Sequence, residues 1–108
     1  MRKALVFYKG EEAGILTQAD NGKFVFEYHD NWLTDSYKPS ISLTLPKNQQ
    51  IHHQDQIFPF FFNMLPEGNN KRLVCNLLRI DEDDYFGLLL ATARFDTIGA
   101  VTVEKIPA

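Results

Sequence analysis

The stretch Asp20-Asn21-Gly22-Lys23-Phe24-Val25-Phe26-Glu27-Tyr28 decides the fold class. Its Asn-Gly pair tolerates the positive φ angles of a type I′ turn, which is the tight turn of many β-hairpins. After the turn, Phe24, Phe26 and Tyr28 fall on every second position, as expected of a strand that buries one face. The stretch therefore predicts an antiparallel hairpin with an aromatic inner face.

The residues before this turn extend the pattern toward the N-terminus. Residues 3–8 are typical of a strand, Lys9-Gly10 of a turn, and residues 11–16 of a second strand that places Ala13 and Ile15 on one face. We therefore expect an antiparallel meander. Beyond it, only residues 41–45 are strand-like, and the polar segment 47–56 is predicted to be a loop.

The second half of the chain changes to helical periodicity. Pro59 suits the start of a short apolar helix through Met64, because proline has no N–H to lose at that position. Pro66-Glu67-Gly68 predicts a tight turn, after which Asn69 or Asn70 caps a second helix. That helix is amphipathic, and its two faces comprise an apolar stripe of Leu73, Val74, Leu77 and Leu78 and an opposite side of Lys71, Arg72, Asn76 and Arg79.

A third helix is expected after Asp81, because three further acids favour the positive end of a helix dipole. Its core positions are Phe86, Leu89, Leu90 and Ala93. Residues 99–103 return to strand. This order predicts an α+β fold, in which a mainly antiparallel sheet, made of an N-terminal meander and a closing strand, carries about three helices on one side. We expect residues 1–108 to form a single domain.

Composition limits the function classes. The chain has 108 residues, 44% of them hydrophobic, and a formal net charge of -3, so direct binding to nucleic-acid phosphates is disfavoured. Its lone Cys75 forms no internal disulfide, which is typical of a protein of the reducing cytoplasm. The N-terminus lacks the pattern of a signal peptide, and the apolar run 57–62 is too short to cross a bilayer.

The motifs of catalysis and of cofactor binding are missing or weak. Neither phosphate-binding glycine motif occurs, and Asp84-Tyr85-Phe86-Gly87 has one residue too many for the Asp-Phe-Gly motif of kinases. We expect the acidic residues 81–84 to cap a helix rather than form a cation-binding loop, because the glycine that such a loop needs is missing. His52, His53 and Asp55 lack the cysteine partners or paired spacing of a metal site. Cys75 has no evident base beside it, so we expect an ordinary thiol, and we predict no catalytic residue, cofactor or metal.

Aromatic and basic residues are the candidates for contact with a partner. We expect Trp32 and the aromatic run 58–62 to lie mainly in the core, because aromatic residues at these spacings are usually buried. Some of them can also contact a partner. We expect a solvent-exposed face to be formed by Lys71, Arg72 and Arg79. The alternative is that these cations contact an acidic partner.

A series of separated segments then points to a family. In chain order these are residues 12–16, 22–28 with Trp32-Leu33, 41–46, 61–68, 86–89 and 96–101. Their order and spacing resemble the N-terminal domain of HipA-type serine/threonine kinases, the toxins of HipBA-like toxin-antitoxin systems, over nearly the whole chain. Arg94-Phe95 departs from the family pattern, in which a glycine is frequent before Asp96.

In HipA-like proteins this region precedes a much longer kinase domain, and this chain ends without one. The chain thus resembles the HipS-like stand-alone antitoxin subunit of three-gene HipBST-type systems, and its start at Met1 favours an independent gene. The resemblance implies a HipA-like (HipT-type) kinase toxin as partner and a HipB-like helix-turn-helix protein that binds DNA, so this chain contacts DNA only indirectly. Two alternatives stay open: the activating or structural half of a split kinase, and a domain excised from a full-length one.

We expect the kinase interface at the turn between the first two predicted helices. A turn braced by proline and glycine is preorganised, so it loses little entropy on docking. A plain helix connection explains the turn equally well. The candidate interface residues are Leu65, Pro66, Glu67, Gly68, Asn69, Asn70, Lys71, Arg72 and Arg79.

Overall fold

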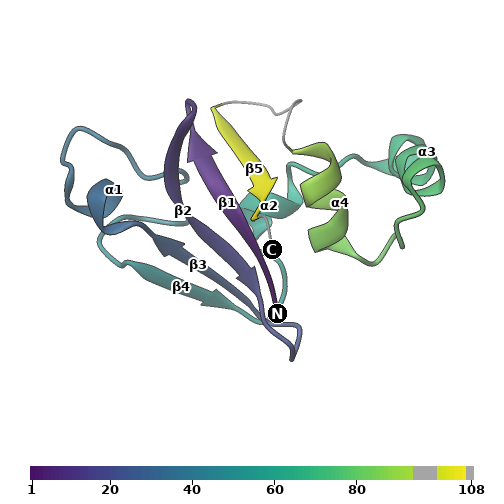
Figure 1. The fold of residues 1–108 in the computed structure, drawn as a ribbon, viewed down its shortest axis with the longest axis horizontal. Coiled ribbons are helices and arrows are strands. Elements are labelled where there is room, and N and C mark those ends of the chain that lie inside the picture. The colour runs from purple at the N-terminus through teal and green to yellow at the C-terminus, as the bar shows by residue number, and fades with distance from the viewer. Residues whose placement is uncertain (94–99, 107–108) are drawn as a thin grey trace.

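The computed structural model describes residues 1–93 and 100–106. Its centre is a five-stranded antiparallel sheet in the order β4-β3-β2-β1-β5 (Figure 1). The strands are β1 (Arg2–Tyr8), β2 (Glu11–Gln18), β3 (Phe24–Tyr28), β4 (Ile51–Gln54) and β5 (Val101–Lys105). The predicted α+β class, with its meander and closing strand, is confirmed.

The turn between β1 and β2 uses left-handed backbone at Lys9 and Gly10, with φ angles of 50° and 83°. A bulge follows, because the register passes from Val6 opposite Gly14 to Phe7 opposite Glu12 and leaves Ala13 as the extra residue. The bulge shifts the alternation, so Leu16 faces the core while Ile15 is only half-buried. The prediction that Ala13 and Ile15 share a buried face was therefore wrong for Ile15.

The hairpin between β2 and β3 exists, but its turn is of a different type. Gly22 has a φ of 85°, whereas Asn21 is not left-handed. The Gly22 N–H donates to the Ala19 carbonyl at 2.9 Å, and the Ala19 N–H donates to the Lys23 carbonyl at 2.9 Å. This is the longer hairpin loop in which glycine follows a turn, so the predicted type I′ geometry was wrong.

The middle of the chain differs most from expectation. Asp30–Thr34 forms the short helix α1, and β4 lies within the segment predicted to be a loop. Residues 41–45, predicted as a strand, instead form a turn around one phenol. The buried Tyr28 hydroxyl donates to the Leu45 carbonyl and accepts from the Ile41 N–H at 3.0 Å, which fixes that turn.

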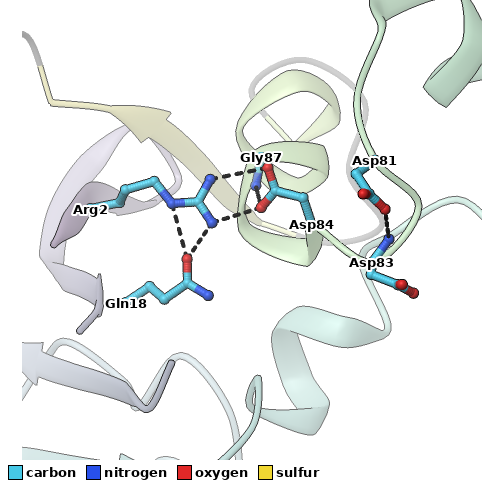
Figure 2. A network of polar contacts seen from close by, with 6 residues as sticks. All are labelled: Arg2, Gln18, Asp81, Asp83, Asp84 and Gly87. Carbon is cyan, nitrogen blue, oxygen red and sulfur yellow. Dashed lines mark hydrogen bonds and ion pairs between the residues drawn. The ribbon is translucent and has the colours of Figure 1, made fainter. Parts of the chain in front are cut away.

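The helices α2 (Pro59–Phe62), α3 (Gly68–Leu78) and α4 (Tyr85–Thr92) follow in the second half. The core holds Phe61 of α2 and Phe86 and Leu89 of α4, packed with Phe26 of β3. Of the other predicted core positions in α4, Ala93 is buried and Leu90 is half-buried. Asp84 caps α4 by accepting from the Gly87 N–H at 3.1 Å, and its carboxylate also meets Arg2 of β1 (Figure 2).

Helix α3 departs from the prediction in two ways. Its N-cap is Glu67, so Asn69 and Asn70 lie inside the helix and cap nothing. The helix lies at one end of the long axis, beyond α4 and away from the sheet (Figure 1). The predicted packing of all helices on one side thus holds for α2 and α4, whereas α3 buries only Cys75.

Candidate interface at helix α3

The predicted interface segment, residues 65–70, joins α2 to α3 and includes the first residues of α3. The predicted tight turn at Pro66-Glu67-Gly68 was wrong, because the turn falls at Asn63 and Met64 and Glu67 is extended, with φ and ψ of -121° and 158°. The first residue of the segment, Leu65, is buried and anchors it, Pro66 is half-buried, and Glu67 to Asn70 are exposed. Gly68 has a φ of 57°, and an added Cβ there would meet open space, so the glycine serves the backbone rather than close packing. A shallow hollow of about 240 Å³ opens beside the segment, between Phe62 and Lys71.

The three predicted basic residues lie in different settings. Lys71 is half-buried, with its Nζ 5.3 Å from the centre of the Tyr85 ring, so this ammonium packs on an aromatic face. Arg72 and Arg79 are exposed. Arg79 forms the C-cap of α3 with a φ of 56°, a position that glycine usually occupies. The structure thus places two of the three cations in solvent on the same helix.

The leucines of α3 are the residues that sequence reasoning misplaced. Leu73, Leu77 and Leu78 are 57%, 72% and 53% exposed, although their helical stripe predicted a core face. Phe62 of α2 is 45% exposed and packs edge-on against Tyr85, with ring centres 5.6 Å apart. The run Phe60-Phe61-Phe62 could have indicated this exposure, because consecutive helical residues point in directions about 100° apart and cannot all face one core.

The acidic run before α4 has a structural role. Asp84 is engaged by Arg2 and Gly87, and Asp81 accepts from the Asp83 N–H at 2.9 Å (Figure 2). The Arg2 hydrogen bonds hold the pKa of the Asp84 carboxyl below its ordinary value. The resemblance of residues 84–87 to a kinase motif therefore reflects a helix cap.

The remaining candidates for chemistry lie in structural settings. The His52 ring bonds the Pro46 carbonyl at 3.0 Å, and His53 and Asp55 are exposed. Cys75 is a buried free thiol. Within residues 1–93 and 100–106, no three His, Cys, Asp or Glu side chains gather as a metal site would require. No helix in the same ranges is long and apolar enough to cross a membrane.

Most of the aromatic candidates belong to the core. Trp32 is buried, and its indole N–H donates to the Pro39 carbonyl at 2.9 Å. Phe58 and Phe61 are buried as well, which leaves Phe62 as the exposed ring of the run. The prediction that this cluster is mainly core is confirmed. Arg94-Phe95, where the chain departs from the family pattern, lies outside the described residues.

Comparison with known proteins gives the fold a family. The model of the HipA N-terminal domain family matches residues 4–104. A solved structure titled "N-terminal domain of HipA toxin" superposes with a TM-score of 0.73 and 32% identity, covering 99% of this chain and 94% of that one.

Three curated relatives differ in how much of their length this chain covers. An uncharacterized protein of Haemophilus influenzae is 32% identical over 105 residues, which cover 97% of this chain and 93% of the relative. Two putative kinases of Sinorhizobium fredii, Y4mE and Y4dM, are 30% and 31% identical over 78% and 88% of this chain, which spans only 20% and 24% of their lengths. By sequence and by structure alike, the chain belongs to the HipA N-terminal domain family.

Proposed function

We propose that this chain is the antitoxin of a toxin-antitoxin system, which binds a separately encoded HipA-like serine/threonine kinase and holds it inactive. One observation carries the proposal. The same domain makes up about a fifth to a quarter of two putative kinases, and it also matches a relative of nearly its own length. A domain found both joined to a kinase and apart from one is well suited to bind that kinase in trans.

The chemistry of the chain supports a binding role rather than catalysis. The match is to the N-terminal domain of the family alone. The carboxylate that most resembles a kinase motif, Asp84, is occupied in capping α4 and pairing with Arg2. We therefore propose that the chain is not an enzyme and that it acts in the cytoplasm as one domain.

Inhibition would be steric and conformational, with the segment at residues 65–70 as the first candidate for contact. Leu65 is buried and Gly68 sets the local backbone, so the exposed residues between α2 and α3 are held in place before binding. Lys71, Arg72 and Arg79 follow the segment. Kinase active sites hold magnesium with carboxylates, which gives these cations an acidic partner of the right kind.

The test is a phosphorylation assay with the cognate HipA-like kinase, with and without this chain. We expect autophosphorylation and substrate phosphorylation to fall as the chain is titrated, and to level off once the kinase is saturated. The mutant Leu43→Ser, changed at a side chain that is 99% exposed and far from the segment in sequence, serves as a control and should inhibit equally. Unchanged kinase activity at saturating binding would refute inhibition.

The kinase-sized relatives favour a second candidate function. Because the domain forms part of those putative kinases, it could complete the fold of a shortened kinase and activate it. The same assay separates the two candidates by sign, since activity then rises on titration. Co-expression gives the cellular counterpart: rescue of growth supports the antitoxin, and growth arrest that requires this chain supports the activator.

A DNA-binding partner completes the proposal. We propose that a HipB-like helix-turn-helix protein joins the chain and the kinase in a ternary complex and makes the contacts to the operator. The chain's formal net charge of -3 supports this division, because a negative chain is repelled by phosphate backbones. Electrophoretic mobility shift with the chain alone should show no binding, whereas the HipB-like protein should retard operator DNA by itself.

A further inference from the structure

We infer that the leucine face of α3, formed by Leu73, Leu77 and Leu78, is the centre of the surface that docks on the HipA-like kinase, and that the segment at residues 65–70 forms its edge. The inference rests on the proposed function, because it names the part of the chain that meets that partner. It moves the centre of the interface from the segment onto the helix.

The first argument is burial. These leucines are 57%, 72% and 53% exposed, whereas a helix of a globular domain ordinarily turns its apolar stripe to the core. Leu73 and Leu77 are one helical turn apart, and Leu78 lies one turn after the half-buried Val74 beside them, so the exposed leucines border one apolar strip. Contiguous exposed apolar surface of this kind marks an interaction site, unlike an isolated surface leucine.

The second argument is that α3 packs against little of its own chain. The helix has 11 residues and buries Cys75 alone, with Val74 and Lys71 half-buried beside it. Helices shorter than about 12 to 15 residues are marginal in water without tertiary packing. Because α3 lies beyond α4 and away from the sheet (Figure 1), a partner that covers the leucines would supply the packing that the rest of the chain does not.

The third argument is charge, and it identifies the occupant. From Gly68 to Arg79 the chain carries Lys71, Arg72 and Arg79 and no acidic residue, although the chain as a whole is acidic. On a helical projection, Arg72 lies across the helix from the leucine face. Helix α3 thus offers an apolar side and, across from it, the exposed cation Arg72, with Arg79 at its C-cap and Lys71 packed on Tyr85. This arrangement fits a cleft with one apolar wall and one wall of carboxylates.

A second copy of this chain fits that description poorly. Two α3 helices paired through their leucines would make no use of the cations, and pairing through the other side would oppose like charges. A kinase domain, whose magnesium-binding cleft is rich in carboxylates, supplies the acidic wall. The charge pattern therefore favours the kinase over a second copy.

The test compares matched serine variants of the full chain. Leu73→Ser/Leu77→Ser removes the centre of the leucine face, and Tyr37→Ser/Leu43→Ser removes two apolar side chains that are 96% and 99% exposed elsewhere. Affinity for the purified cognate kinase is measured by calorimetry. We expect the α3 variant to bind at least about tenfold more weakly and the control to stay within about twofold of the original chain.

Three further measurements check the fold, the position of the contact and the role of charge. Circular dichroism should show that both variants keep the fold, because the leucines add little to the core. Hydrogen exchange of the original chain should show that amides of α3 become protected when the kinase binds, and this readout requires no variant. Arg72→Glu should weaken binding and flatten its dependence on salt, as expected of a cation facing carboxylates.

The outcomes separate this inference from the proposed function. If the original chain binds and inhibits the kinase but Leu73→Ser/Leu77→Ser does so equally well, the antitoxin proposal stands and the docking face is wrong. If the original chain does not bind the kinase at all, both fail. Sedimentation equilibrium tests for a dimer of the original chain. If there is a dimer and Leu73→Ser/Leu77→Ser makes it dissociate, the face belongs to a second copy and the inference is overturned.

Discussion

The guanidinium of Arg2 and the carboxylate of Asp84 form a two-point ion pair that joins the first strand of the chain to the start of α4. Arg2 donates to both carboxylate oxygens of Asp84, at 3.1 and 2.6 Å, and its Nε donates to the Gln18 side chain at 3.0 Å (Figure 2). The same carboxylate caps α4. One side chain therefore links the sheet to the helix that covers part of it.

Removing this carboxylate should destabilise the domain in two steps. Asp84→Asn keeps an oxygen for the Gly87 N–H but loses the ion pair, and we expect a loss of up to about 1 kcal/mol, since both side chains are partly exposed. Asp84→Ala loses the cap as well, at a further cost of about 1 kcal/mol. Urea unfolding measures both values. Asp83→Asn, which removes the same charge at an exposed neighbour, is the control, and an equal loss there would contradict the assignment.

The same pair predicts a dependence of stability on pH. The pKa of the Asp84 carboxyl is lowered in the folded chain, chiefly by its hydrogen bonds to Arg2. Because an unfolded aspartate titrates near pH 3.9, the pair contributes fully above about pH 5 and loses its contribution as pH falls through the folded pKa. The difference in unfolding free energy between the original chain and Asp84→Asn should therefore shrink below about pH 4. A difference that stays constant from neutral to acid pH would exclude this linkage.

Tyr28→Phe should destabilise the domain by about 1 to 3 kcal/mol, because it leaves the buried Ile41 N–H and Leu45 carbonyl without their shared hydroxyl. Thermal unfolding by circular dichroism gives the size of the loss. Tyr37→Phe is the matched control, since that side chain is 96% exposed, and its unfolding temperature should not change. Equal effects from the two substitutions would mean that the hydroxyl of Tyr28 does not hold the turn.

Gly14→Ala should be strongly unfavourable. A Cβ at this position of β2 would lie 2.3 Å from the Glu27 carbonyl oxygen on β3 and 2.9 Å from the Phe26 ring, so two central strands would have to separate. We expect a loss of about 1 to 3 kcal/mol in urea unfolding. Thr17→Ala, on the same strand, should cost less than about 1 kcal/mol. If the Gly14→Ala chain is as stable as the original, β2 and β3 can move apart at this position without loss of stability, and the prediction is wrong.

Much of the fold could be predicted because local patterns decide it. The alternation of Phe24, Phe26 and Tyr28 and the acid cap before α4 require only neighbouring residues, and both predictions are confirmed. The turn at residues 41–45 could not be predicted, because its conformation depends on a hydroxyl that is distant in sequence. Strand β4 could not be predicted, because its His- and Gln-rich sequence has no strand pattern of its own. It is a strand because it pairs with β3.

The elements of the candidate interface could be predicted from the sequence, whereas the exposure of its leucines could not. The break between α2 and α3 at Pro66 and the three cations can be found in the sequence. The exposure of Leu73 and Leu77 cannot, because a periodic apolar stripe looks the same whether it packs on its own chain or on another protein. Burial is a property of the whole structure, so only the position of α3 relative to the sheet identifies the face.

The separation of α3 from the sheet has a consequence for divergence within the family. Because the helix gives only Cys75 to the core, its outward positions can be exchanged at little cost to folding. Under the proposed function, related antitoxin–kinase pairs in one cell can then diverge in which kinase each antitoxin binds, because only a single helix on a common sheet has to change. Under the proposed function, exchanging the surface residues of α3 between two family members should therefore exchange the kinases to which they bind.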